Sequence, residues 1–198
     1  NWKDEGIICA PQPDDLNSPL HPNAKMDRPH ILYNELTKTF VMWMKVMGER
    51  NIQYMVVATS DKITGPYELV NKKLHPGGMN SGDFDLFEDD GKGYIIFERV
   101  HKDMIVMELT DDYLDVTVNY SVHFPRKCPP FVREAPAVFK KDGKFYMFTS
   151  GTTAKFPTPS EVAVSDTIHG EWKVLGDPHI NDKKHTSFDS QISCVFKV

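Results

Sequence analysis

Short apolar and aromatic runs alternate with polar turns along most of the chain, and one such unit recurs three times. Each unit has an apolar pair, a polar turn and a second aromatic-rich run, and the equivalent positions are Tyr33, Phe87 and Phe139. The spacing is 54 residues (87 − 33) and then 52 residues (139 − 87). Two of the turns read Asp-Gly-Lys, at 90–92 and 142–144. A period of about 50 residues built from short strands is typical of a β-propeller blade.

The residue types in these runs favour strands over helices. Val, Ile, Phe, Tyr and Thr dominate them, and helical periodicity is nearly absent. We therefore expect an all-β fold with strands at 30–34, 40–46, 54–60, 67–71, 93–100, 104–109, 145–150, 162–165 and 172–175. A second repeat supports this, because 60–67 matches 165–172, each with a turn that leads into an aromatic residue. We expect those aromatic rings to pack on the blade.

The two ends of the chain suggest further, partial blades. Residues 2–11 are expected to form the outermost strand of an earlier blade, and residues 188–198 the first strand of a later one. An open ring would leave blade faces and strand edges exposed. Residues 1–198 are therefore predicted to be part of a five-bladed β-propeller domain of about 260 to 300 residues, with three complete blades. Such a domain should be a monomer when complete.

Composition and charge narrow the possible partners. The chain has 198 residues, 40% of them hydrophobic, which suits a single core. A net charge of −5 without clustered Lys and Arg argues against nucleic acid as a partner. No apolar run is long enough to predict a membrane span, and the three isolated cysteines lack the spacing of a zinc site. No secretory signal is visible, although the chain begins at Asn1 and a leader could precede it.

Polar residues occur in phase with the blade repeat, just before each expected inner strand. Asp27 lies six residues before Tyr33, Asp83 four before Phe87, and Glu134 five before Phe139. Gln191 lies five residues before Phe196. Because the inner strands of a propeller surround one axis, we expect Asp27, Asp83, Glu134 and Gln191 to converge there.

Carboxylates grouped in a polar cavity are typical of glycoside hydrolysis, in which one acid protonates the leaving oxygen. Burial and neighbouring negative charge keep such an acid protonated. Glu134, in the apolar setting of 133–137, is the best candidate for the acid, and Asp83 is a neighbour that could orient it. The alternatives are that Asp83 caps a turn and that Asp27 forms an ion pair with the adjacent Arg28.

These motifs resemble glycoside hydrolase family 43, and within it the galactan-degrading branch related to exo-β-1,3-galactanases. The resemblance covers nearly the whole chain. The matching segments are 1–6, Asp27-Arg28-Pro29 with 32–34, Asp83 with 86–92, Arg133-Glu134-Ala135-Pro136, and 187–191. Two positions depart from the branch: it usually has Glu where this chain has Asp27, and it usually carries a Trp in the segment that here reads Ala154-Lys155-Phe156.

The resemblance implies an inverting hydrolase of β-galactosyl linkages in a polysaccharide or oligosaccharide. Glu134 would be the general acid, Asp83 would modulate its pKa, and Asp27 and Gln191 would lie on the side of the attacking water. It implies no required cofactor, although some members hold a structural calcium ion on the axis. It favours a secreted or cell-surface location, with a cytoplasmic one as the alternative.

Six further residues are candidates for contacting the sugar: Trp43, Tyr54, His101, Ser150, Thr153 and Ser190. Core packing is the alternative for Trp43, Tyr54 and Phe97, because aromatic residues on strands are commonly buried. An ordinary surface loop is the alternative for His101. Three competing functions stay open: a carbohydrate-binding propeller with weakened catalysis, a family 43 hydrolase for arabinose or xylose, and a scaffold for protein partners.

Overall fold

The computed structural model describes residues 3–196, and these form three four-stranded antiparallel sheets. The first blade consists of β1 (Met26–Asn34), β2 (Thr39–Met47), β3 (Gln53–Ser60) and β4 (Glu68–Leu74). The second consists of β5 (Ser81–Asp89), β6 (Lys92–Arg99), β7 (Asp103–Leu109) and β8 (Val116–His123). The third consists of β9 (Arg133–Lys141), β10 (Lys144–Gly151), β11 (Ser160–Ser165) and β12 (Lys173–Gly176). The predicted all-β, blade-based fold is confirmed.

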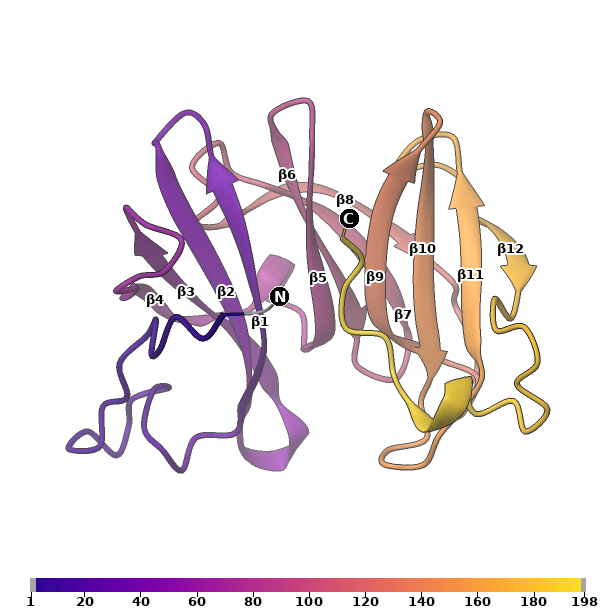
Figure 1. Ribbon diagram of the computed structural model, residues 1–198, viewed down its shortest axis with the longest axis horizontal. Coiled ribbons are helices and arrows are strands. Elements are labelled where there is room, and N and C mark those ends of the chain that lie inside the picture. The colour runs from indigo at the N-terminus through magenta and orange to yellow at the C-terminus, as the bar shows by residue number, and fades with distance from the viewer. Residues whose placement is uncertain (1–2, 197–198) are drawn as a thin grey trace.

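The first strand of each blade, β1, β5 and β9, faces the middle of the molecule, with the later strands arranged outwards (Figure 1). Asp85 on β5 joins all three of these inner strands. One carboxylate oxygen lies 3.1 Å from Nδ1 of His30 on β1, and the other accepts the backbone N–H of Val138 on β9 at 2.7 Å. Since Asp85 is buried, this cross-blade bonding fixes how the three blades sit around the axis.

The repeat read from the sequence corresponds to a structural register. Tyr33, Phe87 and Phe139 each pair with an aromatic residue on the second strand of the blade, namely Phe40, Tyr94 and Tyr146. The rings of Tyr33 and Phe40 lie 4.8 Å apart, and those of Phe139 and Tyr146 lie 5.1 Å apart. Cross-strand aromatic pairs of this kind stabilise antiparallel sheets. The three positions are therefore equivalent in space as well as in sequence.

Hydrophobic cores fill the spaces between neighbouring blades. One core lies between the first and second blades and includes Trp43, Met55, Phe84 and Phe97. A second lies between the second and third blades around Ile96. The apolar faces of the sheets are thus buried against each other, as in other layered β architectures.

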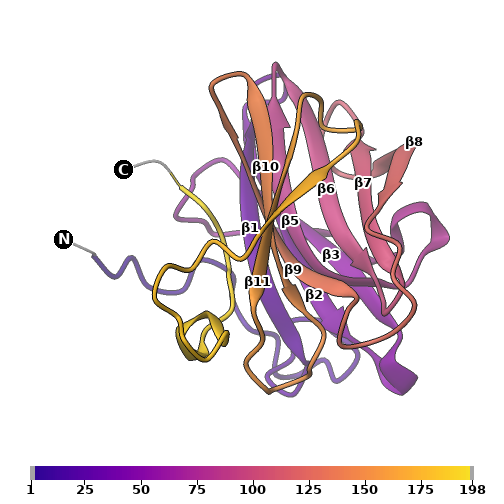
Figure 2. The same ribbon diagram turned by 90° about the vertical axis from the view of Figure 1, so that its right-hand side faces the viewer.

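Both terminal segments differ from the prediction. Residues 3–11 form no strand; instead Ile8 and Cys9 pack on the first blade, and the carbonyl of Ile8 accepts the N–H of Tyr67 at 2.8 Å. Residues 188–196 form no strand either, and Trp2, Lys197 and Val198 lie outside the described residues. The segments before β1 and after β12 lie on the same side of the sheets (Figure 2). Their apolar residues suggested strands, but within residues 3–196 no neighbouring strand pairs with them.

Within the described range the helices are three short 3₁₀ turns, η1 (Glu49–Asn51), η2 (Pro76–Gly78) and η3 (Ser187–Asp189). None of them has the length or the apolar character needed to cross a membrane. Strand β8 was not among the predicted strands, although its residues alternate between apolar and polar types as in a strand with one exposed face. The nine predicted strands fall on β1–β4, β6, β7 and β10–β12, with ends that coincide or shift by up to four residues. Strands β5 and β9 were expected only as inner strands around Phe87 and Phe139, without bounds.

Candidate active site

Each of the three predicted carboxylates lies at a β-bulge near the start of an inner strand. The register of β1 shifts between Asp27 and His30, and that of β5 shifts between Ser81 and Phe84. On β9, Glu134 pairs with Ser150 while Ala137 pairs with Phe148, so the register shifts there as well. A bulge turns a side chain away from its regular direction. It therefore re-aims each acid at the same end of the inner strands.

A lysine joins the first two carboxylates. Nζ of Lys45, on β2, lies 2.6 Å from Oδ1 of Asp83 and 3.1 Å from Oδ1 of Asp27. Its side chain is only 5% exposed. Burial acts to lower the pKa of Lys45, but Asp83 and Asp27 raise it above the ordinary value, so the side chain stays a charged ammonium. Lys45 thus holds the acids of two blades together.

An arginine and the predicted glutamine complete the connection to the third blade. The guanidinium of Arg28 lies 3.0 Å from Oδ2 of Asp83 and donates to Oε1 of Gln191 at 2.7 Å. The amide nitrogen of Gln191 donates to Oε1 of Glu134 at 3.0 Å and to Oγ of Ser150 at 2.9 Å. The structure therefore brings Asp27, Asp83, Glu134 and Gln191 into one connected polar cluster, as predicted.

The environment of Glu134 favours its protonated form. Burial, followed by the negative charges of Asp83 and Glu98, raises the pKa of Glu134 to about 7. The hydrogen bond from Gln191 and the charge of Arg28 act in the opposite direction. A carboxylic acid with a pKa near neutrality holds a transferable proton under mild conditions, as a general acid requires.

Glu98, at the end of β6, is a fourth carboxylate of this cluster. It is 3% exposed, and its Oε1 accepts the backbone N–H of His101 at 2.8 Å and lies 3.1 Å from Nδ1 of that ring. Burial raises the pKa of Glu98 as well. Its other oxygen lies against Gly82, where a Cβ would collide with it. Gly82 is therefore required by the close approach of this carboxylate to the residue before Asp83.

Glu134 also lines a cavity of about 250 Å³. Gln191, Ser190 and Asp189 form one wall, and the loop after β10, with Thr153, Lys155 and Phe156, forms another. Phe156 is 67% exposed and is the aromatic residue of this cavity. The arrangement supplies hydroxyl, amide and carboxylate groups with one exposed ring, which are the groups that contact sugars in binding sites.

Several predicted sugar contacts are wrong in position. Trp43 is fully buried between the blades, where its indole N–H donates to the carbonyl of Tyr113 at 2.9 Å. Ser150 is 1% exposed and accepts a hydrogen bond from Gln191, so it orients that amide and does not face the cavity. Tyr54 lies on β3, away from the axis, where its ring packs near His75 and Lys73.

Thr153 and Ser190 do line the cavity, and the exposed ring of His101 lies beside Glu98, so all three stay predicted sugar contacts.

The expected alternative for Asp27, an ion pair with Arg28, is not what the structure contains. Arg28 pairs with Asp83, and Asp27 pairs with Lys45. The intervening bulge, where Arg28 has a φ of +50°, separates the two neighbouring side chains.

Lys45 and Glu98 were not found from the sequence. Lys45 lies within the buried apolar run of 39–47, and Glu98 directly follows the buried apolar residues of 92–99. A charge in such a run is the signal that could have identified them, because buried charges need partners. Across residues 3–196, no group of three or more His, Cys, Asp or Glu side chains is placed to hold a metal ion.

Three four-stranded blades around one axis define the class of the fold, which is a β-propeller. The carboxylates grouped at that axis are of the kind that glycosidases use. The family model of the glycosyl hydrolases family 43 matches residues 29–192. The chain belongs to this family. A search of curated proteins found no match.

Solved structures of the same family are similar in fold. A family 43 β-1,3-galactosidase is 32% identical with a TM-score of 0.88, and the match covers 100% of this chain and 42% of that one. A second family 43 β-1,3-galactosidase, solved with galactodeoxynojirimycin, is 28% identical with a TM-score of 0.87, covering 99% of this chain and 70% of that one. An exo-β-1,3-galactanase from Clostridium thermocellum is 27% identical with a TM-score of 0.72, covering 86% and 38%. The chain thus spans less than half the length of the first of these relatives.

Proposed function

We propose that this protein hydrolyses β-galactosyl linkages, of the β-1,3-galactan type, with inversion at the anomeric carbon. The observation that carries the proposal is the setting of Glu134, which accepts a hydrogen bond from the amide of Gln191 at 3.0 Å. Burial and the negative charges of Asp83 and Glu98, both on the second blade, raise its pKa to about 7. The similarity to β-1,3-galactosidases and an exo-β-1,3-galactanase supports galactose as the sugar.

In the proposed reaction Glu134 acts as the general acid. Its carboxylic proton passes to the glycosidic oxygen while the bond from that oxygen to the anomeric carbon breaks. Burial beside Asp83 and Glu98 keeps the proton on Glu134 up to a pH of about 7. After transfer the resulting carboxylate is stabilised by the N–H of Gln191, which already lies 3.0 Å away.

A water molecule attacks the anomeric carbon from the opposite face of the sugar. Asp27, the most exposed carboxylate of the cluster at 51%, accepts the proton of this water. The contact with Lys45 fixes the position of the Asp27 carboxylate. Gln191 orients the water or the sugar, since an amide is a poor base. Lys45 and Arg28 hold Asp83 in place, and its negative charge helps to raise the pKa of Glu134.

The test measures hydrolysis by the full-length protein of β-1,3-galactan and of aryl β-galactosides with good leaving groups. Glu134→Gln keeps the shape but removes the proton, so turnover of galactan should fall by roughly 10²- to 10⁴-fold. Activated aryl galactosides need less protonation and should be affected less. Equal losses on both substrates would show that Glu134 is not the acid.

Two further outcomes would replace the proposal. Faster turnover of aryl arabinosides or xylosides than of galactosides would assign another sugar to the same site. Binding of galactan without turnover of any substrate would instead favour a carbohydrate-binding propeller with weakened catalysis. The anomeric configuration of the first product, followed by NMR, tests inversion directly.

A further inference from the structure

The segment between β12 and Gln191 contains no strand and forms a compact, mostly polar loop. Its last turn, at Ser187, Phe188 and Asp189, has φ values of +54°, +56° and +57°. Three successive non-glycine residues in the left-handed region are unusual, because the Cβ atom disfavours that conformation. Such a turn persists only where its surroundings impose it. Only Ser190 separates Gln191 from this turn, so the position of Gln191 depends on the turn.

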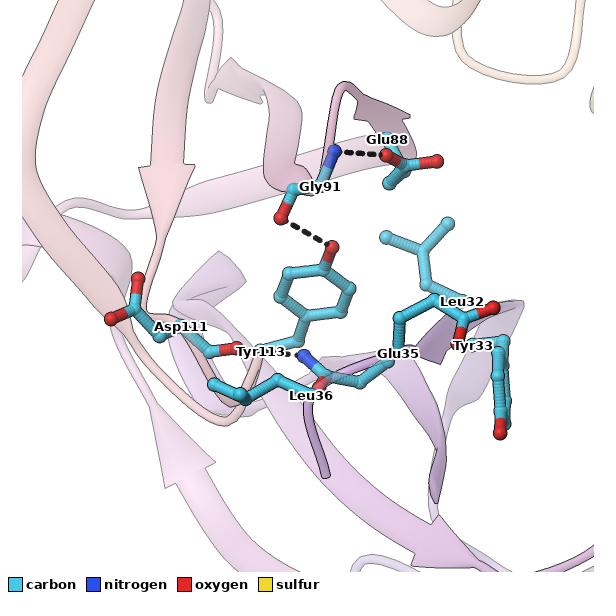
Figure 3. A pocket seen from close by; sticks show the side chains of 9 residues that line it. Leu32, Tyr33, Glu35, Leu36, Glu88, Gly91, Asp111 and Tyr113 are labelled. Carbon is cyan, nitrogen blue, oxygen red and sulfur yellow. Dashed lines mark hydrogen bonds between the residues drawn. The ribbon is translucent and has the colours of Figure 1, made fainter. Parts of the chain in front are cut away.

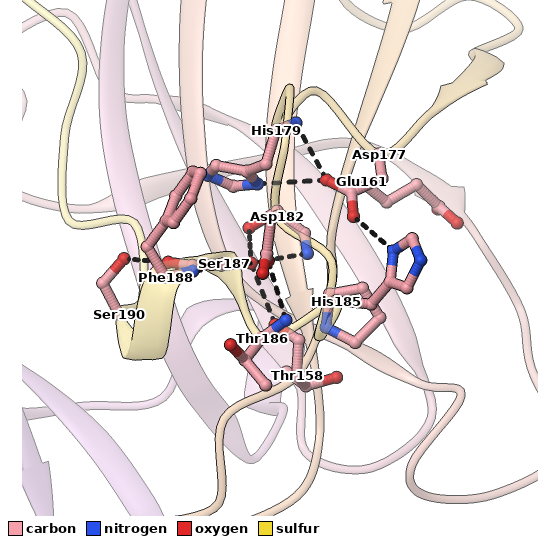
Figure 4. A network of polar contacts seen from close by, with 12 residues as sticks. Thr158, Glu161, Asp177, His179, Asp182, His185, Thr186, Ser187, Phe188 and Ser190 are labelled. Atoms are coloured by element: carbon pink, nitrogen blue, oxygen red, sulfur yellow. Dashed lines mark hydrogen bonds and ion pairs between the residues drawn. The ribbon is translucent and has the colours of Figure 1, made fainter.

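Asp182 provides the main support for the turn from inside the loop. It is a buried residue, 8% exposed, and its Oδ2 accepts the N–H groups of Thr186 at 2.8 Å and of Phe188 at 3.4 Å (Figure 4). Burial acts to raise the pKa of Asp182, but backbone N–H groups, that of Phe188 first, hold it below its ordinary value. The carboxylate therefore stays charged and continues to accept from the turn.

Ser187 attaches the same turn to the third blade. Its Oγ accepts the N–H of Ser160 at 2.8 Å, at the start of β11, and donates to the carbonyl of Thr158 at 2.9 Å. The hydroxyl of Ser190 donates to the carbonyl of Ser187. Ser187 is 1% exposed, so these bonds are shielded from water. The turn is thus held from both sides, one residue before the chain reaches the cluster.

We propose that Asp182 is a positioning residue for the active site: it imposes the left-handed turn at 187–189 and thereby aims the amide of Gln191 at Glu134. Gln191 has three partners, Arg28, Ser150 and Glu134, on two different blades. A small rotation of the backbone after the turn would break all three contacts together. The inference rests on the proposed function for its effect on turnover, but not for its effect on the position of Gln191.

The other cavities and clusters do not reach this site. A cavity of about 700 Å³ is lined by Leu32, Glu88, Asp111 and Tyr113 (Figure 3), at the far ends of β1 and β5 from Asp27 and Asp83. The hydroxyl of Tyr113 already donates a hydrogen bond to the carbonyl of Gly91 at 3.1 Å. By contrast, the loop of Asp182 continues directly into a predicted catalytic residue.

The test needs a measurement that works without turnover. The side-chain carboxyl of Glu134 is followed by ¹³C NMR over a pH titration of the full-length protein, with Glu134→Gln to assign the signal. Because the N–H of Gln191 lowers the pKa of Glu134, loss of that bond should raise the pKa further above about 7. We expect Asp182→Ala and Gln191→Ala to give the same upward shift, and the double variant to add nothing. Asp182→Asn, which keeps an acceptor oxygen, should shift it less.

Asp112→Ala is the matched control, because Asp112 also supports a turn, accepting the N–H of Leu114 at 3.0 Å, but does so in the second blade. It should leave the titration of Glu134 unchanged. If Asp182→Ala folds cooperatively and leaves the pKa of Glu134 unchanged, or if its shift adds to that of Gln191→Ala, the proposal is wrong.

Turnover by Asp182→Ala should fall by roughly 10- to 100-fold, as expected for a misplaced catalytic group. If the wild-type protein hydrolyses no glycoside, the proposed function fails while the NMR result still decides the role of Asp182.

Discussion

Nζ of Lys45 lies 2.6 Å from Oδ1 of Asp83, and this contact crosses from the second strand of one blade to the inner strand of the next. Lys45 also contacts Asp27, so a single buried cation bridges two acids and reduces the repulsion between them. The relationship explains how several carboxylates can lie close together in a folded protein. Glu134, by contrast, has no ion pair with a cation among the described residues, and its pKa is raised to about 7.

Lys45→Met should be strongly destabilising. It keeps most of the length and the apolar character of the side chain but leaves Asp83 and Asp27 without their shared cation, at a cost of about 3 kcal/mol in the free energy of unfolding. Urea unfolding at pH 7 measures this. Lys140→Met is the matched control, because Lys140 pairs with Asp89 at 2.6 Å on a more open surface, and its loss should change stability little. Equal effects of the two substitutions would contradict the role given to Lys45.

The pH dependence of hydrolysis should report the pKa of Glu134. Because the acid must be protonated, activity should decline as the pH rises through about 7. Glu98→Gln removes a nearby negative charge, which makes ionisation of Glu134 easier and lowers its pKa. The alkaline limb of kcat/KM should therefore move to lower pH. Glu108→Gln, the same change on β7, should leave the profile where it is; a shift there, or none with Glu98→Gln, would be evidence against this assignment.

The stability of the protein should also depend on Glu134. Its pKa of about 7 in the folded state lies above the ordinary value of 4.5, so the folded state holds this proton more tightly than the unfolded state. The resulting stabilisation is complete below the ordinary pKa and is lost as the pH rises through about 7. Glu134→Gln cannot ionise, so relative to the wild type it should gain about 2 to 3 kcal/mol between pH 5 and pH 8. Urea unfolding at the two pH values tests this, and a constant difference would refute it.

Trp43 and Phe156 should behave in opposite ways when substituted. Trp43→Phe removes a buried N–H donor and leaves the carbonyl of Tyr113 without it, which should cost about 1 to 3 kcal/mol of stability without changing KM. Phe156→Ala removes the exposed ring at the cavity of Glu134, so KM for galactan oligosaccharides should rise while stability is retained. Thermal unfolding and steady-state kinetics of both variants check this. A raised KM for Trp43→Phe alone would restore Trp43 as a sugar contact.

Much of the fold was readable from the sequence because blade strands are local and repetitive. The spacing of Tyr33, Phe87 and Phe139 reflects a register in which each pairs with an aromatic residue on the adjacent strand. The course of 188–196 was not readable, because its irregular backbone follows contacts with residues far away in the chain. Strand β8 was missed although its residues alternate as in a strand. The substitution of a loop for the expected strand after residue 187 is the largest difference.

The sequence by itself determined that Asp27, Asp83 and Glu134 meet at the axis, since they lie six, four and five residues before the repeated aromatic positions of the inner strands. Only the tertiary structure decided which partners they have. The bulges at 27–30 and 81–84 re-aim the side chains, and Lys45 and Glu98 reach the cluster from neighbouring strands. The reason is physical: strand periodicity is encoded locally, whereas the charge balance of a buried cluster depends on residues that are far apart in the chain and close only after the blades pack.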